Sequence, residues 1–343
     1  MVYFAGKREK RHLASHPFFL FFKKKKKTQL TPQGLAQVAE FDTRDGVYDV
    51  AWSEAADGVV ATAGGDGSVK LWAVNASAQS NPAASFQEHA REVSSLSWNV
   101  STRRELLLSA SWDDSVRLWD AAGARPRPLA AFLGAHQGCC YGVSWNPRHS
   151  DVFATCGGDG LLKIWDARRP PDAPPTLSVP VVSDPGMGIG AMMQATPPAE
   201  ALCLDWCKYN DALLAVGSVD RCVRLIDVRR GGGSSPSPLT APSPSQSPVV
   251  AALHGHAYAV RRVAFSPHQE AVIASASYDM TVRLWDAAAP GEPLVKVWNH
   301  HSEFAVGLDF STLVRGRMAS CGWDDAAFVW SVNGADPRAP SLF

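Results

Sequence analysis

The chain has 343 residues, which is enough for two ordinary domains or one large β domain, and its 33 basic and 33 acidic residues balance. Residues 1–34 hold nine Lys or Arg and one acid, a net charge of +8, so the remainder must carry −8 to reach the total of zero. A mildly acidic body excludes nucleic acid as the main partner, because phosphate contacts need a basic face.

The first segment in chain order, residues 1–35, is Phe-rich and then Lys-rich low-complexity sequence, and we expect it to be disordered. Its apolar run "PFFLFF" is far shorter than the roughly 20 apolar residues of a spanning helix, so we expect no direct membrane insertion. The seven cysteines show no spacing typical of a zinc site or a CxxC redox pair. We therefore expect a reducing compartment, no disulfide framework, no metal and no cofactor.

From residue 36 the chain repeats one pattern six times. A turn Asp is followed six residues later by Trp, or once by Ile, and is preceded by an aromatic residue 14 or 15 positions earlier. Nine residues before that aromatic residue the chain has His in four copies, Thr in one and Pro in one. The turn residues are Asp66, Asp113, Asp159, Asp220, Asp279 and Asp324, and the positions six later are Trp72, Trp119, Trp165, Ile226, Trp285 and Trp330. The leading positions are Thr43, His89, His136, Pro197, His256 and His301.

This spacing predicts an all-β propeller. Segments such as "VYDVAWS" and "VRRVAFS" alternate like strands, the turn Asp joins a second strand to a third, and copies 45 to 61 residues apart have the period of a four-stranded blade. We expect six complete four-stranded blades within 36–332 and a seventh, N-terminal blade that is truncated or irregular, with an outer strand near 36–41. The Pro-, Ser- and Gly-rich stretches 168–198 and 229–250 predict flexible loops, and 333–343 a C-terminal tail.

The recurring His, Ser and Asp predict a structural hydrogen-bond network and not a catalytic triad, because a triad occurs once, in a cleft. The chain also lacks a phosphate-binding glycine loop opening a helix, so we expect no enzyme. On this interpretation Asp113→Ala should destabilise the fold by about 1–3 kcal/mol. Asp220→Ala should cost less, because its repeat already lacks the His (Pro197) and the Trp (Ile226).

Over about residues 38–332 the pattern resembles WD40-repeat proteins, and further motifs resemble one family among them. These motifs are "FDTRDGVYDVAWSE", "EHAREVSSLSWN", "SASWDDSVRLWD", "LDWCKYND", "GHAYAVRRVAFSPH" and "HHSEFAVGLDFS". Together they are similar to the peroxin-7 family, the peroxisomal receptors for the type-2 targeting signal. "LDWCKYN" and "HHSEFAVGLDFS" are the most specific, since neither is needed to make a blade. The chain departs from the family at its N-terminal blade, at Pro197 and in its two long loops.

The resemblance implies a cytoplasmic receptor that cycles to the peroxisome, both membrane and matrix. Its cargo proteins carry the N-terminal signal Arg-Leu-(five residues)-His-Leu. Its other partners would be a co-receptor, the long form of the type-1 signal receptor, and docking proteins at the peroxisome. The alternative is a general WD40 scaffold, such as a chromatin or ubiquitin-ligase adaptor, which explains the repeats equally well but not the two specific motifs.

A receptor for that signal, which by resemblance is an amphipathic helix, needs carboxylates beside exposed apolar surface. In a propeller the loop before the first strand and the residue before the turn Asp share one face. The acids expected there are Asp45, Glu92, Glu200 and Glu303, and the aromatic residues are Trp112, Tyr258, Tyr278, Phe304 and Trp323. We expect the acids to attract the signal's basic residues, and Trp112, Tyr278 and Trp323 to take its Leu side chains. The simpler alternative is that an acid pairs with a neighbour such as Arg44 or Arg91.

Overall fold

The structure is a computed structural model of the whole chain. It describes residues 2–6, 24–31, 34–43, 45–56, 58–73, 81–102, 105–122, 127–181, 199–231 and 247–332. Within these residues the elements are 26 strands and one 3-10 helix, η1 (Val228–Gly231).

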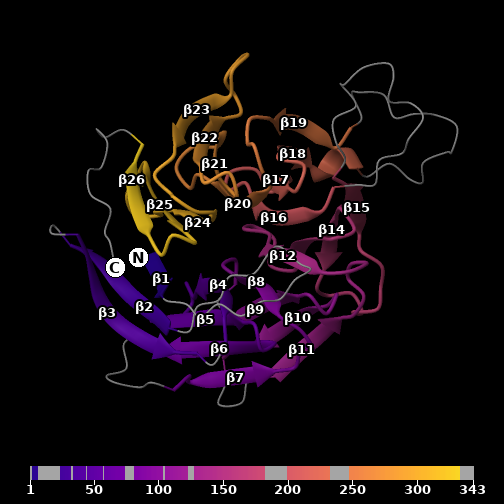
Figure 1. Cartoon of the computed structure of the whole chain (residues 1–343). Coiled ribbons are helices and arrows are strands. Elements are labelled where there is room, and N and C mark those ends of the chain that lie inside the picture. Colours follow the sequence, from indigo (N-terminus) through magenta and orange to yellow (C-terminus); the bar gives the residue numbers. More distant parts are fainter. Residues whose placement is uncertain are drawn as a thin grey trace, which may run out of the picture.

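Each of the six repeats folds into its own antiparallel sheet, here called blades 1 to 6, and the sheets stand around a common centre (Figure 1). Blade 1 contains β4 (Val47–Trp52), β5 (Val59–Gly64), β6 (Ser68–Ala73) and β7 (Ala84–Gln87). Blade 2 contains β8 (Val93–Trp98), β9 (Leu106–Ser111), β10 (Val116–Asp120) and β11 (Arg127–Phe132). Blade 3 contains β12 (Cys140–Trp145), β13 (Val152–Gly157), β14 (Leu161–Asp166) and β15 (Leu177–Pro180). The predicted all-β propeller is confirmed.

Blades 4 and 5 repeat the arrangement, while blade 6 has three strands in the described residues. Blade 4 contains β16 (Ala201–Trp206), β17 (Leu213–Ser218), β18 (Val223–Asp227) and β19 (Val249–Leu253). Blade 5 contains β20 (Val260–Phe265), β21 (Val272–Ser277), β22 (Val282–Asp286) and β23 (Leu294–Trp298). Blade 6 contains β24 (Ala305–Phe310), β25 (Arg317–Gly322) and β26 (Ala327–Ser331). The expectation of a fourth strand is therefore met in five of the six blades.

A three-stranded sheet formed by β1 (Val2–Gly6), β2 (Lys24–Thr31) and β3 (Gly34–Asp42) lies between blade 6 and blade 1 (Figure 1). It contains the expected outer strand near 36–41 and is one strand short of a full blade. The expectation that 1–35 is disordered is wrong for β1 and β2. Strand pairing uses backbone groups, and an open edge of β3 can pair with a segment that lacks the blade pattern. The remainder of 1–35 lies outside the described residues.

The two long loops are shorter than the sequence predicts. The stretch 168–198 includes β15, whose backbone pairs with β14, so it is not a loop between residues 177 and 180. The stretch 229–250 ends inside β19, which pairs with β18. Residues 182–198, 232–246 and the tail 333–343 lie outside the described residues.

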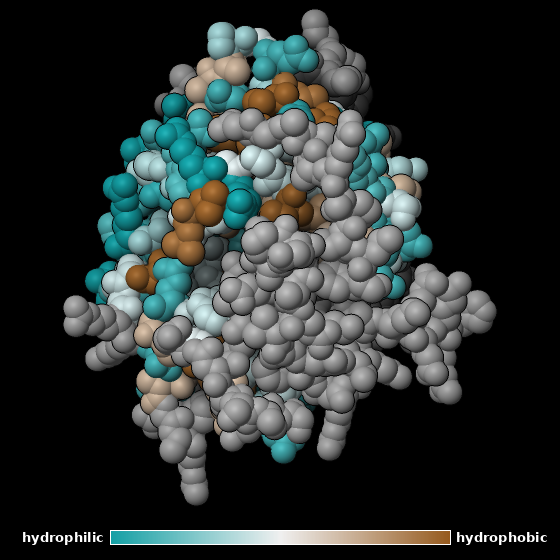
Figure 2. All heavy atoms as spheres, turned by 90° about the vertical axis from the view of Figure 1, so that its left-hand side faces the viewer, coloured by the Kyte–Doolittle hydropathy of each residue, from teal (hydrophilic) through white to brown (hydrophobic). Residues whose placement is uncertain are grey.

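The apolar core lies between neighbouring blades. Its clusters combine residues of consecutive sheets, as where Ala61 and Val69 of blade 1 pack with Trp98 and Trp119 of blade 2. Small residues fill the second strands as predicted, and at Gly157 an added Cβ would lie 2.7 Å from Cγ of His136. On the side of the ring shown in Figure 2, the described apolar residues form separate groups among hydrophilic ones.

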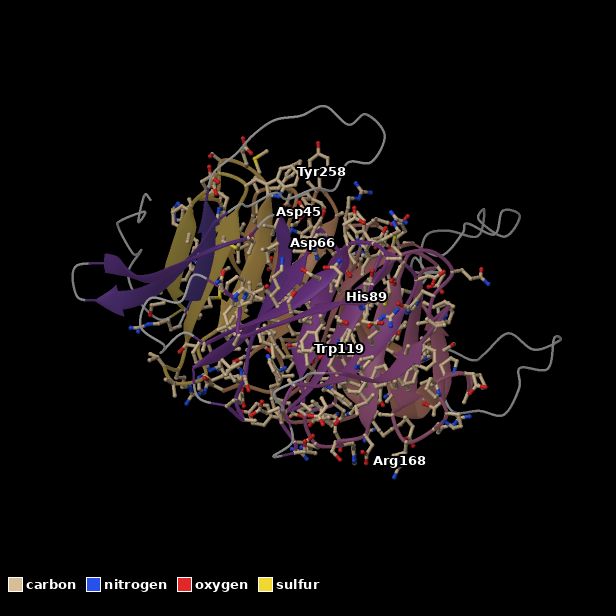
Figure 3. The ribbon with its side chains drawn as sticks, turned by 90° about the horizontal axis from the view of Figure 1, so that it is seen from below. Asp45, Asp66, His89, Trp119, Arg168 and Tyr258 are labelled. Carbon is tan, nitrogen blue, oxygen red and sulfur yellow. The ribbon has the colours of Figure 1, made fainter. Side chains whose placement is uncertain are left out.

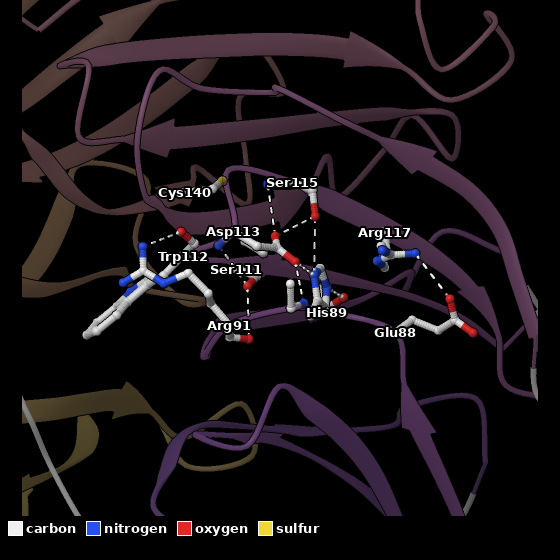
Figure 4. A network of polar contacts seen from close by, with 12 residues as sticks. Glu88, His89, Arg91, Ser111, Trp112, Asp113, Ser115, Arg117 and Cys140 are labelled. Atoms are coloured by element: carbon white, nitrogen blue, oxygen red, sulfur yellow. Dashed lines mark hydrogen bonds and ion pairs between the residues drawn. The ribbon is translucent and has the colours of Figure 1, made fainter.

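The expected hydrogen-bond network is present in four repeats, and Figure 4 shows the one in blade 2. Nδ1 of His89 donates to the Asp113 carboxylate at 3.0 Å, and Nε2 accepts from the Ser109 hydroxyl at 2.7 Å. The Trp119 indole then donates to the same Ser109 oxygen at 2.9 Å. Burial alone would raise the pKa of the Asp113 carboxyl, but hydrogen bonds from His89 and Ser115 hold it well below its ordinary value.

The other three networks repeat this geometry. The imidazoles lie 2.7 to 2.9 Å from the turn carboxylates in the pairs His136–Asp159, His256–Asp279 and His301–Asp324. The third-strand tryptophans donate to a hydroxyl of the second strand, at 2.8 to 2.9 Å, in Trp165–Thr155, Trp285–Ser275 and Trp330–Ser320. The predicted positions of Trp72, Trp119, Trp165, Ile226, Trp285 and Trp330 on third strands are confirmed, and all six are buried.

Blade 4 replaces the network with a buried ion pair. Arg224 on β18 is 2% exposed, and both its terminal nitrogens donate to the two carboxylate oxygens of Asp220. One of these nitrogens also donates to the Ser218 hydroxyl at 3.0 Å. The expectation that this repeat has only a weakened network is therefore wrong, and the structure reverses the predicted order of Asp220→Ala and Asp113→Ala. The guanidinium of the residue four positions after the turn Asp donates to the carboxylate that accepts from an imidazole in the other networks.

The motif "LDWCKYN" forms the junction between blades 4 and 5. A carboxylate oxygen of Asp205 accepts from the Phe265 backbone N–H at 2.8 Å, and the Tyr209 hydroxyl donates to the Pro267 carbonyl at 2.9 Å. The Cys207 thiol lies 3.7 Å from the Glu270 carbonyl oxygen. These residues thus connect two neighbouring blades.

Candidate functional site

The loop before each first strand and the turn before each third strand lie on one face of the ring, here called the turn face. In every blade a backbone N–H next to the turn Asp donates to a carbonyl of the preceding loop. Examples are Trp112 to Glu92 at 2.9 Å and Trp323 to Phe304 at 2.9 Å. Figure 3 shows Asp45 and Tyr258 on this face and Arg168 on the opposite one. The geometric premise of the predicted site is therefore correct.

A first aromatic cluster on the turn face joins three blades, and we call it the Trp112 cluster. The Trp112 ring lies 5.4 Å from Tyr48 and 6.4 Å from Tyr141, both edge to face. The Tyr141 hydroxyl donates to the Glu200 carboxylate at 3.1 Å. Burial raises the pKa of Tyr48, and the carboxylates of Glu92 and Asp45 raise it further. The cluster is thus an apolar surface bordered by three predicted acids.

A second aromatic cluster joins blades 5 and 6, and we call it the Trp323 cluster. The Phe304 ring lies 4.9 Å from Tyr278 and 4.8 Å from Trp323. Tyr278 is only 7% exposed, so the expectation that it offers exposed surface is wrong, and Phe304 and Trp323 are the accessible members. The Trp323 indole N–H is buried and has no hydrogen-bond partner among the described residues.

Arg261 on β20 acts on one tyrosine of each cluster. Burial raises the pKa of both Tyr48 and Tyr278, and the Arg261 charge opposes the rise at each, so the guanidinium is near one member of each cluster. Arg261 forms no ion pair with a carboxylate of the described chain. The turn face therefore carries two apolar clusters, acids around the first, and an arginine that acts on a tyrosine of each.

The sequence prediction missed Tyr48, Tyr141 and Arg261, and all three occupy the same structural position. Each is the second residue of a first strand, where the backbone register slips between Val47 and Asp49, Cys140 and Gly142, and Val260 and Arg262. A β-bulge turns the side chain of the extra residue away from the regular alternation. The same slip occurs in all six first strands, so the repeated second position was the available signal.

The four predicted acids differ in their surroundings. Glu92 lies 3.7 Å from the Arg91 guanidinium, so the simpler alternative that an acid pairs with its neighbour applies to Glu92. The Glu92 side chain nevertheless remains 25% exposed. Asp45 accepts a hydrogen bond from the Gly46 N–H at 2.7 Å, and Glu303 has no ion-pair partner within the described ranges. Arg44 lies outside the described residues. Tyr258 is 62% exposed and contacts the ring of neither cluster.

The inner strands below the turn face carry further charges that the sequence analysis did not select. Arg262 lies 3.7 Å from Asp49, which raises the pKa of the guanidinium. Burial raises the pKa of the Asp309 carboxyl, and the charge of Arg262 partly offsets this rise. No group of three or more His, Cys, Asp or Glu in the described part of the chain is arranged to hold a metal ion.

The ring of sheets with its repeated Trp–Ser–His–Asp network defines a WD-repeat β-propeller. The family model "WD domain, G-beta repeat" matches residues 36–73, 80–120, 127–166 and 247–286. In the described residues, no helix has the length and apolar character to cross a membrane.

Several curated proteins match most of the chain. "Peroxisome biogenesis protein 7" of Arabidopsis thaliana is 45% identical over 306 residues, covering 89% of this chain and 84% of the relative. "Peroxisomal targeting signal 2 receptor" of Mus musculus is 35% identical and covers 87% and 81%, and that of Saccharomyces cerevisiae is 29% identical and covers 87% and 86%. The chain belongs to the peroxisomal targeting signal 2 receptor family. Receptor-named relatives and the propeller fold indicate a non-catalytic protein.

Proposed function

We propose that this chain binds the type-2 peroxisomal targeting signal of cargo proteins on its turn face. With a co-receptor, the long form of the type-1 signal receptor, it delivers them from the cytoplasm to docking proteins at the peroxisome. The proposal rests on one observation, the pair of aromatic clusters with acids beside the first, in a chain whose relatives are named for that signal.

The signal has two leucines that a helix would place on one face, and the turn face has two apolar clusters that could receive them. In Arg-Leu-(five residues)-His-Leu the leucines are seven residues apart, which places them on one face of a helix about 10.5 Å apart. One leucine packs on the Trp112 cluster and the other on Phe304 and Trp323. This binding mode, an amphipathic helix on an apolar surface, takes its affinity from apolar anchors at such positions.

The acids supply negative charge opposite the signal's Arg and His. Asp45, Glu92 and Glu200 border the Trp112 cluster, and Glu303 precedes Phe304 in the loop of the Trp323 cluster. Charge-assisted hydrogen bonds to partly buried carboxylates are stronger than neutral ones. Tyr258 is exposed on the same face.

Charge reversal tests this assignment. Asp45→Lys and Glu92→Lys should each weaken binding of a fluorescent signal peptide about tenfold at low salt, and less at high salt, without lowering Tm. The matched control is Asp151→Lys, because Asp151 is an exposed acid in the turn between β12 and β13, away from the turn face. Unchanged peptide affinity in both turn-face variants would place the signal elsewhere.

A further inference from the structure

Glu200 is held in a different way from the other acids beside the Trp112 cluster. The Tyr141 hydroxyl on β12 of blade 3 donates to the Glu200 carboxylate at 3.1 Å, and Glu200 stands just before β16 of blade 4. By contrast, the Asp45 carboxylate accepts from the next residue along the chain, and Glu92 lies beside the preceding one. The position of the Glu200 carboxylate therefore depends on a side chain from the neighbouring blade.

The same tyrosine is part of the apolar surface. Its ring lies 6.4 Å from that of Trp112, edge to face. Burial raises the pKa of the Tyr141 hydroxyl, and the negative charge of Glu200 raises it further, so the hydroxyl stays protonated and can donate at neutral pH. One side chain thus connects the Glu200 carboxylate to the Trp112 cluster.

Blades 3 and 4 are also joined by contacts that do not involve Tyr141. The Asn146 side-chain amide donates to the Asp211 carbonyl at 2.8 Å, and the Trp206 indole donates to the Ser144 carbonyl at 3.2 Å. Apolar residues of both blades share one buried cluster. Removing only the Tyr141 hydroxyl leaves all of these contacts in place, so we expect little effect on the stability of the blade junction.

We propose that Tyr141 is a positioning residue that holds Glu200 where it can pair with the Arg of the targeting signal. The inference rests on the proposed function above. Arg and Leu are consecutive in the signal, and consecutive residues of a helix point about 100° apart. They therefore need a carboxylate and an apolar surface that adjoin each other. Tyr141 supplies this junction, because its hydroxyl fixes the carboxylate while its ring belongs to the cluster. A carboxylate that is already ordered loses less conformational freedom when it binds a guanidinium.

The test measures fluorescence anisotropy of the full chain with two labelled peptides, the intact signal and the same signal with only its Arg replaced by Ala. Tyr141→Phe keeps the ring and removes the hydroxyl. It should weaken the intact peptide about three- to tenfold and leave the affinity for the Ala peptide unchanged. Glu200→Gln should weaken the intact peptide at least as much. Adding Tyr141→Phe to Glu200→Gln should cause no further loss, because the hydroxyl acts through the carboxylate.

Tyr209→Phe is the matched control. It removes a tyrosine hydroxyl that donates to the Pro267 carbonyl at 2.9 Å, in the turn between β16 and β17, and it should change the affinity for neither peptide. The proposal is overturned if Tyr141→Phe binds the intact peptide like the wild-type chain, weakens both peptides equally, or adds to the effect of Glu200→Gln. In those cases the wild-type chain still binds the signal, and the proposed receptor function stands. Failure of the wild-type chain to bind the intact peptide would overturn the proposed function, and this inference with it.

Discussion

Asp220→Ala should destabilise the protein more than Asp113→Ala. Asp220 neutralises Arg224, whose side chain is 2% exposed, through two hydrogen bonds from its terminal nitrogens. Removing one partner of a buried ion pair leaves an uncompensated charge and costs about 3–5 kcal/mol. Asp113 accepts hydrogen bonds from the imidazole of His89 and the N–H of Ala90 and has no Arg or Lys ion-pair partner among the described residues, so its removal should cost about 1–3 kcal/mol.

Urea unfolding of the two variants and of the double variant Asp220→Ala/Arg224→Met provides the assay. The double variant removes the buried charge and keeps an apolar stem, so it should recover most of the stability that Asp220→Ala loses. The reasoning is refuted if Asp220→Ala is the milder change, or if the double variant is as unstable as the single one.

Three further predictions concern the networks and the blade junction. Burial lowers the pKa of His136, His256 and His301, so the unfolded chain takes up their protons first. The contribution of these histidines to the free energy of unfolding should therefore be fully present above about pH 6.5 and fall as the pH drops below that value. The loss is at most about 1.4 kcal/mol per pH unit for each His, and equal urea midpoints at pH 7.5 and 5.5 would contradict this. Ser109→Ala leaves Nε2 of His89 and the Trp119 indole N–H without their hydrogen-bond partner and should lower the free energy of unfolding in urea by about 1–3 kcal/mol. An unchanged urea midpoint would count against the network. Tyr209→Phe removes a hydrogen bond of a side chain in contact with water and should cost only about 0.5–1 kcal/mol in thermal unfolding, so a cost near that of Ser109→Ala would argue against this view of the junction.

The repeated spacing predicted the fold because each blade is specified locally. The alternation of "VYDVAWS", the turn at Asp66 and the Trp72 position act within about 25 residues, and burial of the same residue types recurs in every blade. The N-terminal sheet could not be predicted in this way. There β2 pairs with β3 and β1 pairs with β2, and this backbone pairing is made by segments that lack the side-chain pattern of a blade.

The site was predicted in outline and missed in detail for two physical reasons. The bulge in each first strand turns Tyr48, Tyr141 and Arg261 toward the turn face, whereas simple alternation does not predict that direction. Arg224 shows the second reason: a basic residue four positions after the turn Asp is visible in several repeats, but only the packed blade shows that this one is buried against Asp220 where the His is missing. The turn-face acids were predictable because their loops are fixed by the repeat.

The central claim is that the turn face recognises the type-2 signal through its basic residues and its leucines. The most direct measurement is fluorescence anisotropy of the full chain with a labelled signal peptide and with the same peptide in which Arg and His are replaced by Ala. We predict saturable binding of the first and at least tenfold weaker binding of the second, with the difference shrinking as salt increases. Equal affinity for the two peptides, or no binding of either, would contradict the account.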